Sequence, residues 1–207
     1  MIALETTMDF LTIVATTVMA VSASIQAVRH GFDPFGAVVL AIVTAVGGGT
    51  LRDLLIGAFP VFWIKDISFL ATAVPVGFVT YLIAKNLKAG NGRRLRLLLY
   101  FDAVGLALFS LVGVQVAVMS GTSAPIAVVL GCITGVAGGM FRDVLCGLTP
   151  SILKEDLYAT ISLIGGGFYL LLRVYLSEET SVIAAFLAMT LARVWVVKRS
   201  AQKDRYT

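Results

Sequence analysis

Two Arg-Asp pairs, at residues 52–53 and 142–143, lie inside long apolar stretches of this chain. A charged side chain within a bilayer is costly and marks a functional site by default. The two pairs belong to a duplicated motif, because residues 47–66 and 137–156 share eight identities in twenty positions. In each copy a glycine cluster precedes the charged pair within one helical turn. The repeated motif is therefore the first candidate for a functional site.

The glycine cluster of each motif is expected to interrupt a membrane helix. Glycine lowers helix stability by about 1 kcal/mol relative to alanine, so adjacent glycines favour a break. At a break, free backbone carbonyls can replace part of the hydration shell of a cation. We predict a monovalent-cation site at the carbonyls near Gly47, Gly48 and Gly138. The other residues expected to line the pathway are Thr44, Gly49, Thr50, Thr134 and Gly139. The alternative is that the glycines only permit close helix crossing.

The charged residues of the motifs complete the predicted site. Adjacent residues point to different sides of a helix, so an Arg and its own Asp are not expected to pair. We predict pairing between the two copies instead, Arg52 with Asp143 and Asp53 with Arg142. Such pairs would set the electric field along a pathway. The alternative is a buried clamp that touches no solute.

A further carboxylate, Asp102, stands alone near the start of the fourth apolar stretch. It is either a helix-start residue at the membrane interface or an inward-facing group that attracts cations. Ninety residues earlier the chain has Thr12, so we do not expect a symmetric acidic pair.

The composition identifies an integral membrane protein. Hydrophobic residues make up 58% of the 207 residues, charged residues only 14%, and the mean hydropathy is +0.95. A soluble domain has about 25% charged residues. The net charge of +4 comes from basic residues in short connections between apolar stretches, a pattern typical of membrane topology rather than of nucleic-acid binding.

Seven apolar stretches are long enough to cross a bilayer, which takes about 20 residues in a helix. They cover residues 10–28, 35–56, 67–84, 97–119, 126–146, 157–176 and 181–197. The predicted fold is all-helical, with two three-helix repeats followed by a seventh helix, and with the second and fifth helices broken at the glycines. An odd number of crossings per repeat inverts the second repeat relative to the first, as in many transporters.

The predicted organisation is a single membrane domain, 1–207. Its parts are repeat one (10–84), a basic connector (85–96), repeat two (97–176), the seventh helix (181–197) and a basic tail (198–207). With the N-terminus outside, eleven basic residues fall on the inner side against two outside. The positive-inside rule therefore predicts an outer N-terminus and a cytoplasmic C-terminus. The basic connector is a topology signal, with anionic lipid binding as the alternative.

Several kinds of chemistry have no support in this sequence. It contains no Walker loop, no paired His-Cys metal spacing and no nucleophile elbow. The glycines at 47–49 lie inside an apolar span rather than after a strand, which argues against dinucleotide binding. Cys132 and Cys146 fall in one predicted helix, too far apart to form a disulfide. We therefore expect no enzyme, no cofactor and no nucleic-acid partner.

The chain resembles the prokaryotic branch of the trimeric intracellular cation (TRIC) channel family, over nearly its whole length. The resemblance rests on residues 44–53 with Pro60, on 100–106, and on 138–145 with Pro150. The same domain has also been labelled a glycine transporter. The resemblance implies a homotrimer of seven-helix protomers in the cell membrane. It also implies one pore per protomer, lined by kinked second and fifth helices and permeable to potassium or sodium ions.

The leading hypothesis is accordingly a potassium-permeable channel, with membrane lipids, monovalent cations and its own copies as partners. An alternative is a secondary transporter for a small neutral amino acid such as glycine, in which Arg52 and Arg142 bind the substrate carboxylate. A third is a membrane scaffold without a solute pathway. An ohmic potassium conductance favours the first, saturable stoichiometric flux the second, and the absence of both the third.

Overall fold

The structure is a computed structural model that describes residues 2–87, 90–154 and 157–203. Lys88, Asp156 and the last four residues of the predicted tail lie outside the described residues. The described elements, in chain order, are α1 (Ile2–Arg29), α2 (Pro34–Ile56), α3 (Phe62–Lys65), α4 (Ser68–Asn86), α5 (Asn91–Met119), α6 (Ala124–Leu145), α7 (Ser151–Lys154), α8 (Tyr158–Tyr175) and α9 (Glu178–Lys203).

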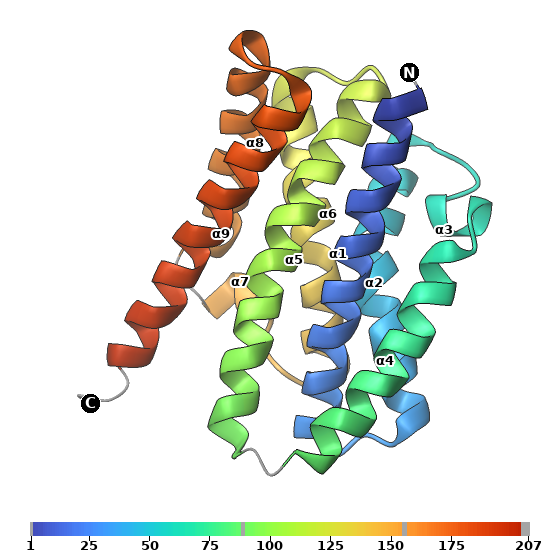
Figure 1. Cartoon of the computed structure of the whole chain (residues 1–207), viewed down its shortest axis with the longest axis vertical. Coiled ribbons are helices and arrows are strands. Elements are labelled where there is room, and N and C mark those ends of the chain that lie inside the picture. Colours follow the sequence, from blue (N-terminus) through green and yellow to red (C-terminus); the bar gives the residue numbers. More distant parts are fainter. Residues whose placement is uncertain (1, 88–89, 155–156, 204–207) are drawn as a thin grey trace.

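The long helices form a bundle around α5, and seven of the described helices are long and apolar enough to cross a membrane (Figure 1). The all-helical fold with seven spans is confirmed. Helix α5 contacts α1 and α6 along its length, α2 packs on α6 and α1, and α9 covers α8 and α5. The turns α1–α2 and α5–α6 lie at opposite ends of the bundle, so α2 and α6 run antiparallel (Figure 1).

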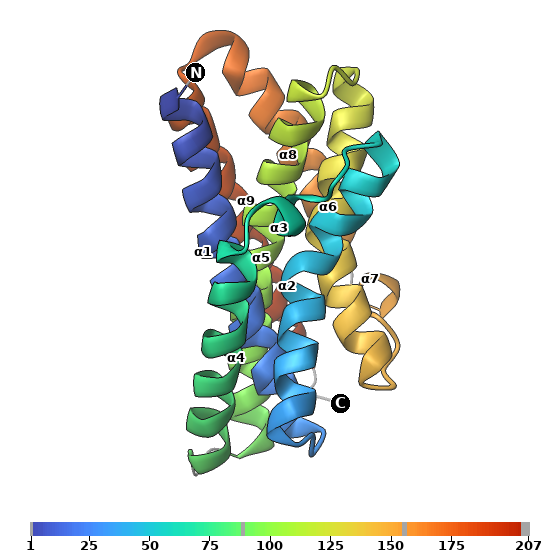
Figure 2. The same cartoon turned by 90° about the vertical axis from the view of Figure 1, so that its right-hand side faces the viewer.

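The two repeats show the same order of elements. Helices α1, α2, α3 and α4 of the first correspond to α5, α6, α7 and α8 of the second. Figure 2 shows α3 nearer the end of the bundle that carries the N-terminus and α7 nearer the opposite end. This placement is what an inverted repeat requires.

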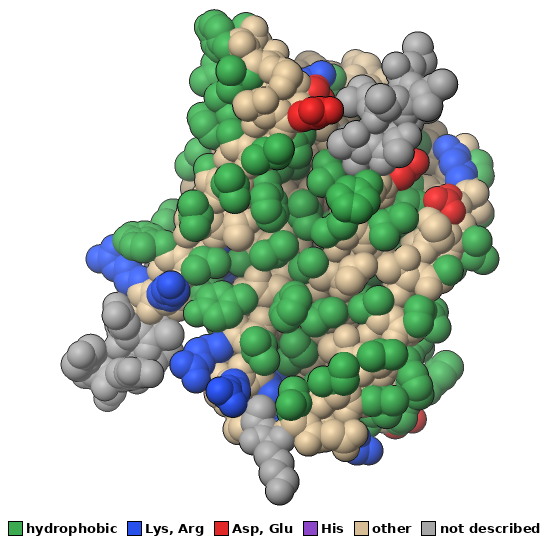
Figure 3. All heavy atoms as spheres, viewed as in Figure 1, with side chains coloured by type: hydrophobic (Ala, Val, Ile, Leu, Met, Phe, Trp, Pro, Cys, Tyr) green, Lys and Arg blue, Asp and Glu red, His purple; other side chains and the backbone are tan. Residues whose placement is uncertain are grey.

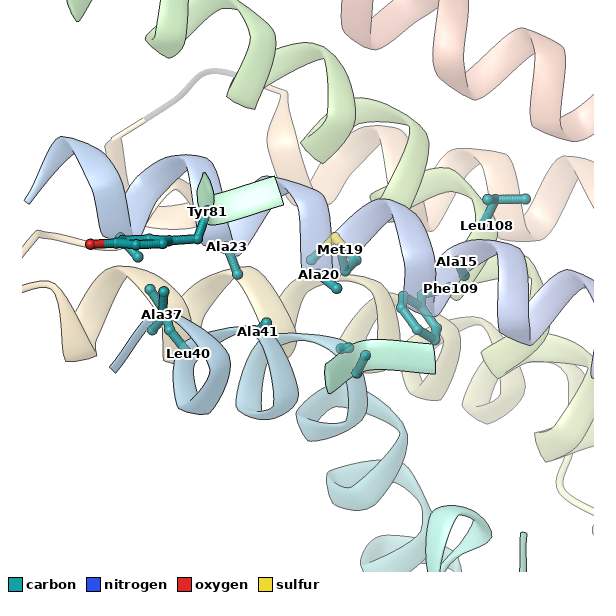
Figure 4. Close-up of a cluster of buried hydrophobic side chains, with 13 residues drawn as sticks. Ala15, Met19, Ala20, Ala23, Ala37, Leu40, Ala41, Tyr81, Leu108 and Phe109 are labelled. Carbon is teal, nitrogen blue, oxygen red and sulfur yellow. The ribbon is translucent and has the colours of Figure 1, made fainter. Parts of the chain in front are cut away.

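Small side chains let the helices pack closely. One core cluster joins alanines of α1 with those of α2, among them Ala20, Ala23, Ala37 and Ala41 (Figure 4). Each of these alanines is fully buried. With so little side-chain volume between them, the backbones of α1 and α2 can approach one another.

The prediction that the second and fifth spans are broken is wrong. Both α2 and α6 are continuous α-helices through their glycine clusters. Helix α2 begins with Pro34 after Asp33, whose Oδ1 accepts a hydrogen bond from the Gly36 amide at 2.7 Å. Its last residue, Ile56, is followed by Gly57, whose φ of +71° is readily adopted by glycine. Tertiary packing therefore outweighs the low helix propensity of the glycines.

Some predicted boundaries also shift. The predicted basic connector is largely helical, since α4 extends to Asn86 and α5 begins at Asn91. Arg94 lies in the first turn of α5, and its Nη2 donates to the Ala84 and Leu87 carbonyls at the end of α4, at 2.8 and 3.0 Å. The predicted tail is helical up to the last residue of α9, Lys203.

Candidate functional site

Each Arg-Asp pair is formed within one motif. Arg52 donates from Nε and Nη2 to Oδ1 of Asp53, at 2.9 and 2.6 Å. The other carboxylate oxygen, Oδ2, accepts the amide hydrogen of Phe62 at 2.8 Å and so holds the start of α3. Both charged side chains are nearly fully buried.

The second motif repeats this arrangement. Arg142 donates from Nε and Nη2 to Oδ1 of Asp143, at 3.0 and 2.9 Å. Oδ2 of Asp143 accepts from the amide and the hydroxyl of Ser151, each at 3.0 Å, at the start of α7. Each aspartate therefore joins its own arginine to the short helix that follows.

The predicted pairing across the two-fold axis is therefore wrong. It assumed that neighbouring side chains on a helix cannot meet. The arginine side chain is long enough to fold back along the helix, and its planar guanidinium presents two N–H groups to a single carboxylate oxygen. Each pair ties its own helix to the short helix that follows, and a role of the pairs along a solute pathway stays a prediction.

Arg142 differs from Arg52 in having a second carboxylate partner. Its Nη1 donates to Oδ1 of Asp102 on α5 and to Oγ of Ser22 on α1, both at 2.7 Å. The Tyr158 hydroxyl donates to Oδ2 of Asp102 at 2.7 Å. The Arg193 guanidinium lies over the Tyr158 ring, 4.5 Å from its centroid. We call these residues, together with Asp143, the Arg142 cluster.

Asp102 is 2% exposed, so its carboxylate faces the protein interior and is not a helix-start group at the membrane interface. The cluster draws on α1, α5, α6, α8 and α9. Sequence reasoning did not identify Ser22, Tyr158 or the role of Arg193 as members. The position of Arg193 inside the seventh apolar stretch is the sequence feature that points to a buried charged site, but the neighbouring residues in the sequence do not identify its partners.

Between the two charged sites, α2 and α6 cross with their backbones in contact. A Cβ atom added at Gly48 would lie 2.0 Å from the Thr134 carbonyl oxygen. One added at Gly138 would lie 2.3 Å from the Thr44 carbonyl oxygen. The two contacts are related by the 90-residue offset of the repeats. The glycines therefore permit close crossing, as the alternative interpretation had it.

The threonine hydroxyls at the crossing are engaged within their own helices. Thr44 donates to the Leu40 carbonyl and Thr134 to the Leu130 carbonyl, both at 2.6 Å. Both threonines are 1% exposed. In this conformation both hydroxyl groups donate their hydrogen to a backbone carbonyl one helical turn earlier.

The other residues predicted to line the pathway lie in contact with side chains of neighbouring elements. A Cβ atom at Gly47 would lie 2.6 Å from the Phe141 ring, and one at Gly49 would lie 2.5 Å from the Phe62 ring. Gly139 faces the Arg142 cluster, where an added Cβ would lie 3.2 Å from the Tyr158 hydroxyl. The hydroxyl oxygen of Thr50 accepts from the Trp63 indole nitrogen at 2.9 Å.

Beside Arg52 there is a cavity of about 270 Å³, which we call the Arg52 cavity. Its polar lining comes from Asp9, Thr12, Arg52, Lys65 and Asp66. Aromatic and aliphatic walls include Phe62, Phe69, Phe109 and Val112. The two charged sites are therefore unlike: one arginine is enclosed by protein groups, and the other borders a cavity.

The chain is similar in sequence and in fold to known membrane proteins. A sequence model of the family described as "Glycine transporter" matches residues 9–85 and 99–174. A UPF0126 membrane protein of Vibrio cholerae is 40% identical over 95% of this chain and 82% of its own. The TRIC channel orthologue from Rhodobacter sphaeroides has a TM-score of 0.86 at 34% identity, over 93% of this chain and 98% of its own. A prokaryotic TRIC channel crystallised in 0.5 M KCl has a TM-score of 0.89 at 28% identity, over 95% and 98%. The chain therefore belongs to this family, which unites UPF0126 membrane proteins with the prokaryotic TRIC-type cation channels.

Proposed function

We propose that this protein is a potassium-permeable channel of the cell membrane, with one pore in each protomer of a homotrimer. The observation that carries the proposal is the symmetric crossing of α2 and α6, with one buried charged site following it along each helix. The likeness to TRIC-type cation channels supports it.

In the proposed pathway, ions pass where α2 and α6 cross. The backbone contact between Gly48 and Thr134 leaves no room for an ion between the two helices at that level. Conduction therefore requires the helices to separate there. Separation would expose the Thr44 and Thr134 carbonyls, which could then replace water around a monovalent cation.

The buried arginines are compatible with cation passage because carboxylates offset their charges. Asp53 offsets Arg52, and Asp102 and Asp143 together offset Arg142 and Arg193. An arginine next to a carboxylate presents a weaker repulsive field to a cation than an isolated arginine would. We propose that these pairs shape the field at either end of the pathway.

The test is potassium efflux from proteoliposomes at an imposed voltage, with and without external glycine. We expect rapid voltage-driven efflux that glycine does not change. To locate the pore, Thr44→Cys and Thr134→Cys are introduced separately after Cys132→Ala and Cys146→Ala, and are treated with a cationic methanethiosulfonate reagent. Modification at either position should reduce efflux several-fold.

The matched control is Gly167→Cys on α8, which is exposed and has open space around its α-carbon. Its modification should leave efflux unchanged. Tight liposomes that accumulate labelled glycine would replace the channel by a transporter. Efflux that survives modification at both threonines would move the pathway away from the crossing.

A further inference from the structure

The inverted repeat makes an internal comparison possible at the two arginines. The 90-residue offset relates Arg52 to Arg142, Thr12 to Asp102, and Val112 to Ser22. Helix α1 of the first repeat corresponds to α5 of the second. Asp102 on α5 therefore has Thr12 on α1 as its counterpart, and Ser22 on α1 has Val112 on α5. Both counterparts line the Arg52 cavity. The cavity therefore lies where the second repeat has its additional carboxylate and hydroxyl.

The hydrogen bonds of Arg52 agree with this correspondence. Nε and Nη2 donate to Asp53, as they do to Asp143 in the second repeat. Nη1 of Arg142 donates to Asp102 and Ser22. Among the described residues, the side-chain hydrogen bonds of Arg52 come from Nε and Nη2, and both go to Asp53. The nitrogen that Arg142 uses to bind Asp102 is Nη1, and no hydrogen bond from Nη1 of Arg52 is found among the described residues.

The cavity also has the size and access that a small solute needs. Its volume of about 270 Å³ lies just below the range of pockets for drug-sized ligands, which fits a solute of a few heavy atoms. Lys65 and Asp66, at the junction of α3 and α4, are exposed and line it. A solute could therefore enter from the surface at that junction.

We propose that the Arg52 cavity binds a small solute through a carboxylate, which takes the place that Asp102 holds in the second repeat. An arginine is suited to this because it can bind a carboxylate with parallel N–H donors. The binding is independent of whether the protein conducts cations.

The rest of the lining bears on the kind of carboxylate. Asp66 borders the same cavity and could receive an ammonium group. The hydroxyl and amide of Ser68 donate to Asp66 at 2.7 and 2.8 Å and hold the pKa of that carboxyl below its usual range, so it is charged at neutral pH. A free amino acid and a simple carboxylate such as acetate share the chemistry that Arg52 recognises, and the experiment separates them.

The experiment measures the thermal unfolding midpoint of the detergent-solubilised protein as sodium acetate, glycine or methylammonium chloride is added. Sodium chloride at equal ionic strength is the control. A ligand that binds only the folded state raises the midpoint in a saturable way. We expect glycine or acetate to raise the unfolding midpoint in this saturable way, and methylammonium to leave it unchanged. Equal effects of the two identify the carboxylate alone, and a tenfold lower half-saturation for glycine identifies a zwitterion.

Two variants locate the binding. Thr12→Asp supplies the carboxylate that the second repeat has, so its midpoint should no longer respond to either ligand. Its matched control, Thr12→Val, keeps the size of threonine and adds no group that could occupy the position of the carboxylate, so its midpoint should respond like that of the wild type. Arg52→Gln should abolish the response, and its own midpoint without ligand shows whether it is folded.

Three results would overturn the proposal. The first is no saturable response of the wild type to glycine or acetate. The second is an unchanged response in Thr12→Asp. The third is a methylammonium response as strong as that of glycine, because the ammonium group would then be what is recognised. Potassium efflux plays no part in these measurements, so failure here leaves the channel proposal intact.

Discussion

At the residue scale, the same Arg-Asp dipeptide has two different surroundings in one chain. Arg52 has one carboxylate partner among the described residues, whereas Arg142 has two and also contacts Ser22. Removing one partner of a buried ion pair leaves an uncompensated charge, whose cost is about 3–5 kcal/mol. The Arg142 cluster holds two carboxylates and two arginines, so removing Asp102 leaves one carboxylate against two arginines.

Asp102→Asn tests the cost of losing this carboxylate. We expect a loss of about 3–5 kcal/mol in the free energy of unfolding, because the substitution removes a buried carboxylate from Arg142 and an acceptor from Tyr158. The matched variant at the equivalent position, Thr12→Val, should cost below about 1 kcal/mol. Unfolding midpoints of the purified proteins compare the two. Equal shifts would show that the Arg142 cluster does not depend on Asp102.

A second prediction at this scale concerns Cys146, the residue that follows α6 and caps it, outside the membrane-spanning segment. Burial raises the pKa of its thiol to about 11, although the nearby Arg142 opposes the shift. Since the thiolate is the reactive form, alkylation by iodoacetamide at pH 8 should be at least about tenfold slower than that of a free cysteine. In a Cys132→Ala background, the rate should continue to rise with pH up to about 10. A rate that levels off near pH 9, as in the denatured protein, would contradict the raised pKa.

At the scale of elements, glycine in α2 and α6 serves the approach of two backbones rather than a break in either helix. The close contacts at Gly48 and Gly138 involve carbonyl oxygens, which cannot rotate away as a side chain can. Any side chain there must push the helices apart. Overpacking of this kind typically costs about 1–3 kcal/mol.

Gly48→Ala and Gly138→Ala should each lower the unfolding free energy by about 1–3 kcal/mol for this reason. Gly167→Ala is the control, since α8 has open space at that position and alanine favours a helix by about 1 kcal/mol. It should leave the midpoint unchanged or raise it. If all three variants behaved alike, the crossing would not be under steric constraint.

At the scale of the whole molecule, charge is distributed unevenly between the two ends of the bundle. On the face in Figure 3, lysine and arginine side chains gather mainly toward the end opposite the N-terminus. The first turns of α5 contribute Arg93, Arg94 and Arg96, and the end of α9 contributes Lys198 and Arg199. This end is expected to face the cytoplasm.

Reporter fusions test the orientation. A green fluorescent protein fused after Thr207 should fluoresce in bacterial cells, because the positive-inside rule places that end in the cytoplasm. Alkaline phosphatase inserted at Gly121, in the turn between α5 and α6 at the other end, should be active. Phosphatase activity at the C-terminus together with none at Gly121 would reverse the topology.

The sequence alone determined the membrane class, the seven spans, the inverted duplication and the family. The first three depend on local hydropathy or on the 90-residue self-similarity, and the family depends on the resemblance carried by residues 44–53, 100–106 and 138–145. All of these can be read without knowing which side chains meet. Most positions later found at the charged sites and the crossing, such as Arg52, Asp102 and Gly48, were also identified. Their residue types are unusual inside apolar spans.

The tertiary structure decided which groups pair and what the glycines do. Local geometry favoured pairing between the repeats and broken helices, but the arginines fold back onto their own aspartates, and α2 and α6 stay continuous. The partners of Arg142 lie 40 residues away at Asp102 and 120 away at Ser22, on other helices. Only packing brings such groups together, because the cost of burying a charge in an apolar interior is met by whichever polar groups the fold places within reach.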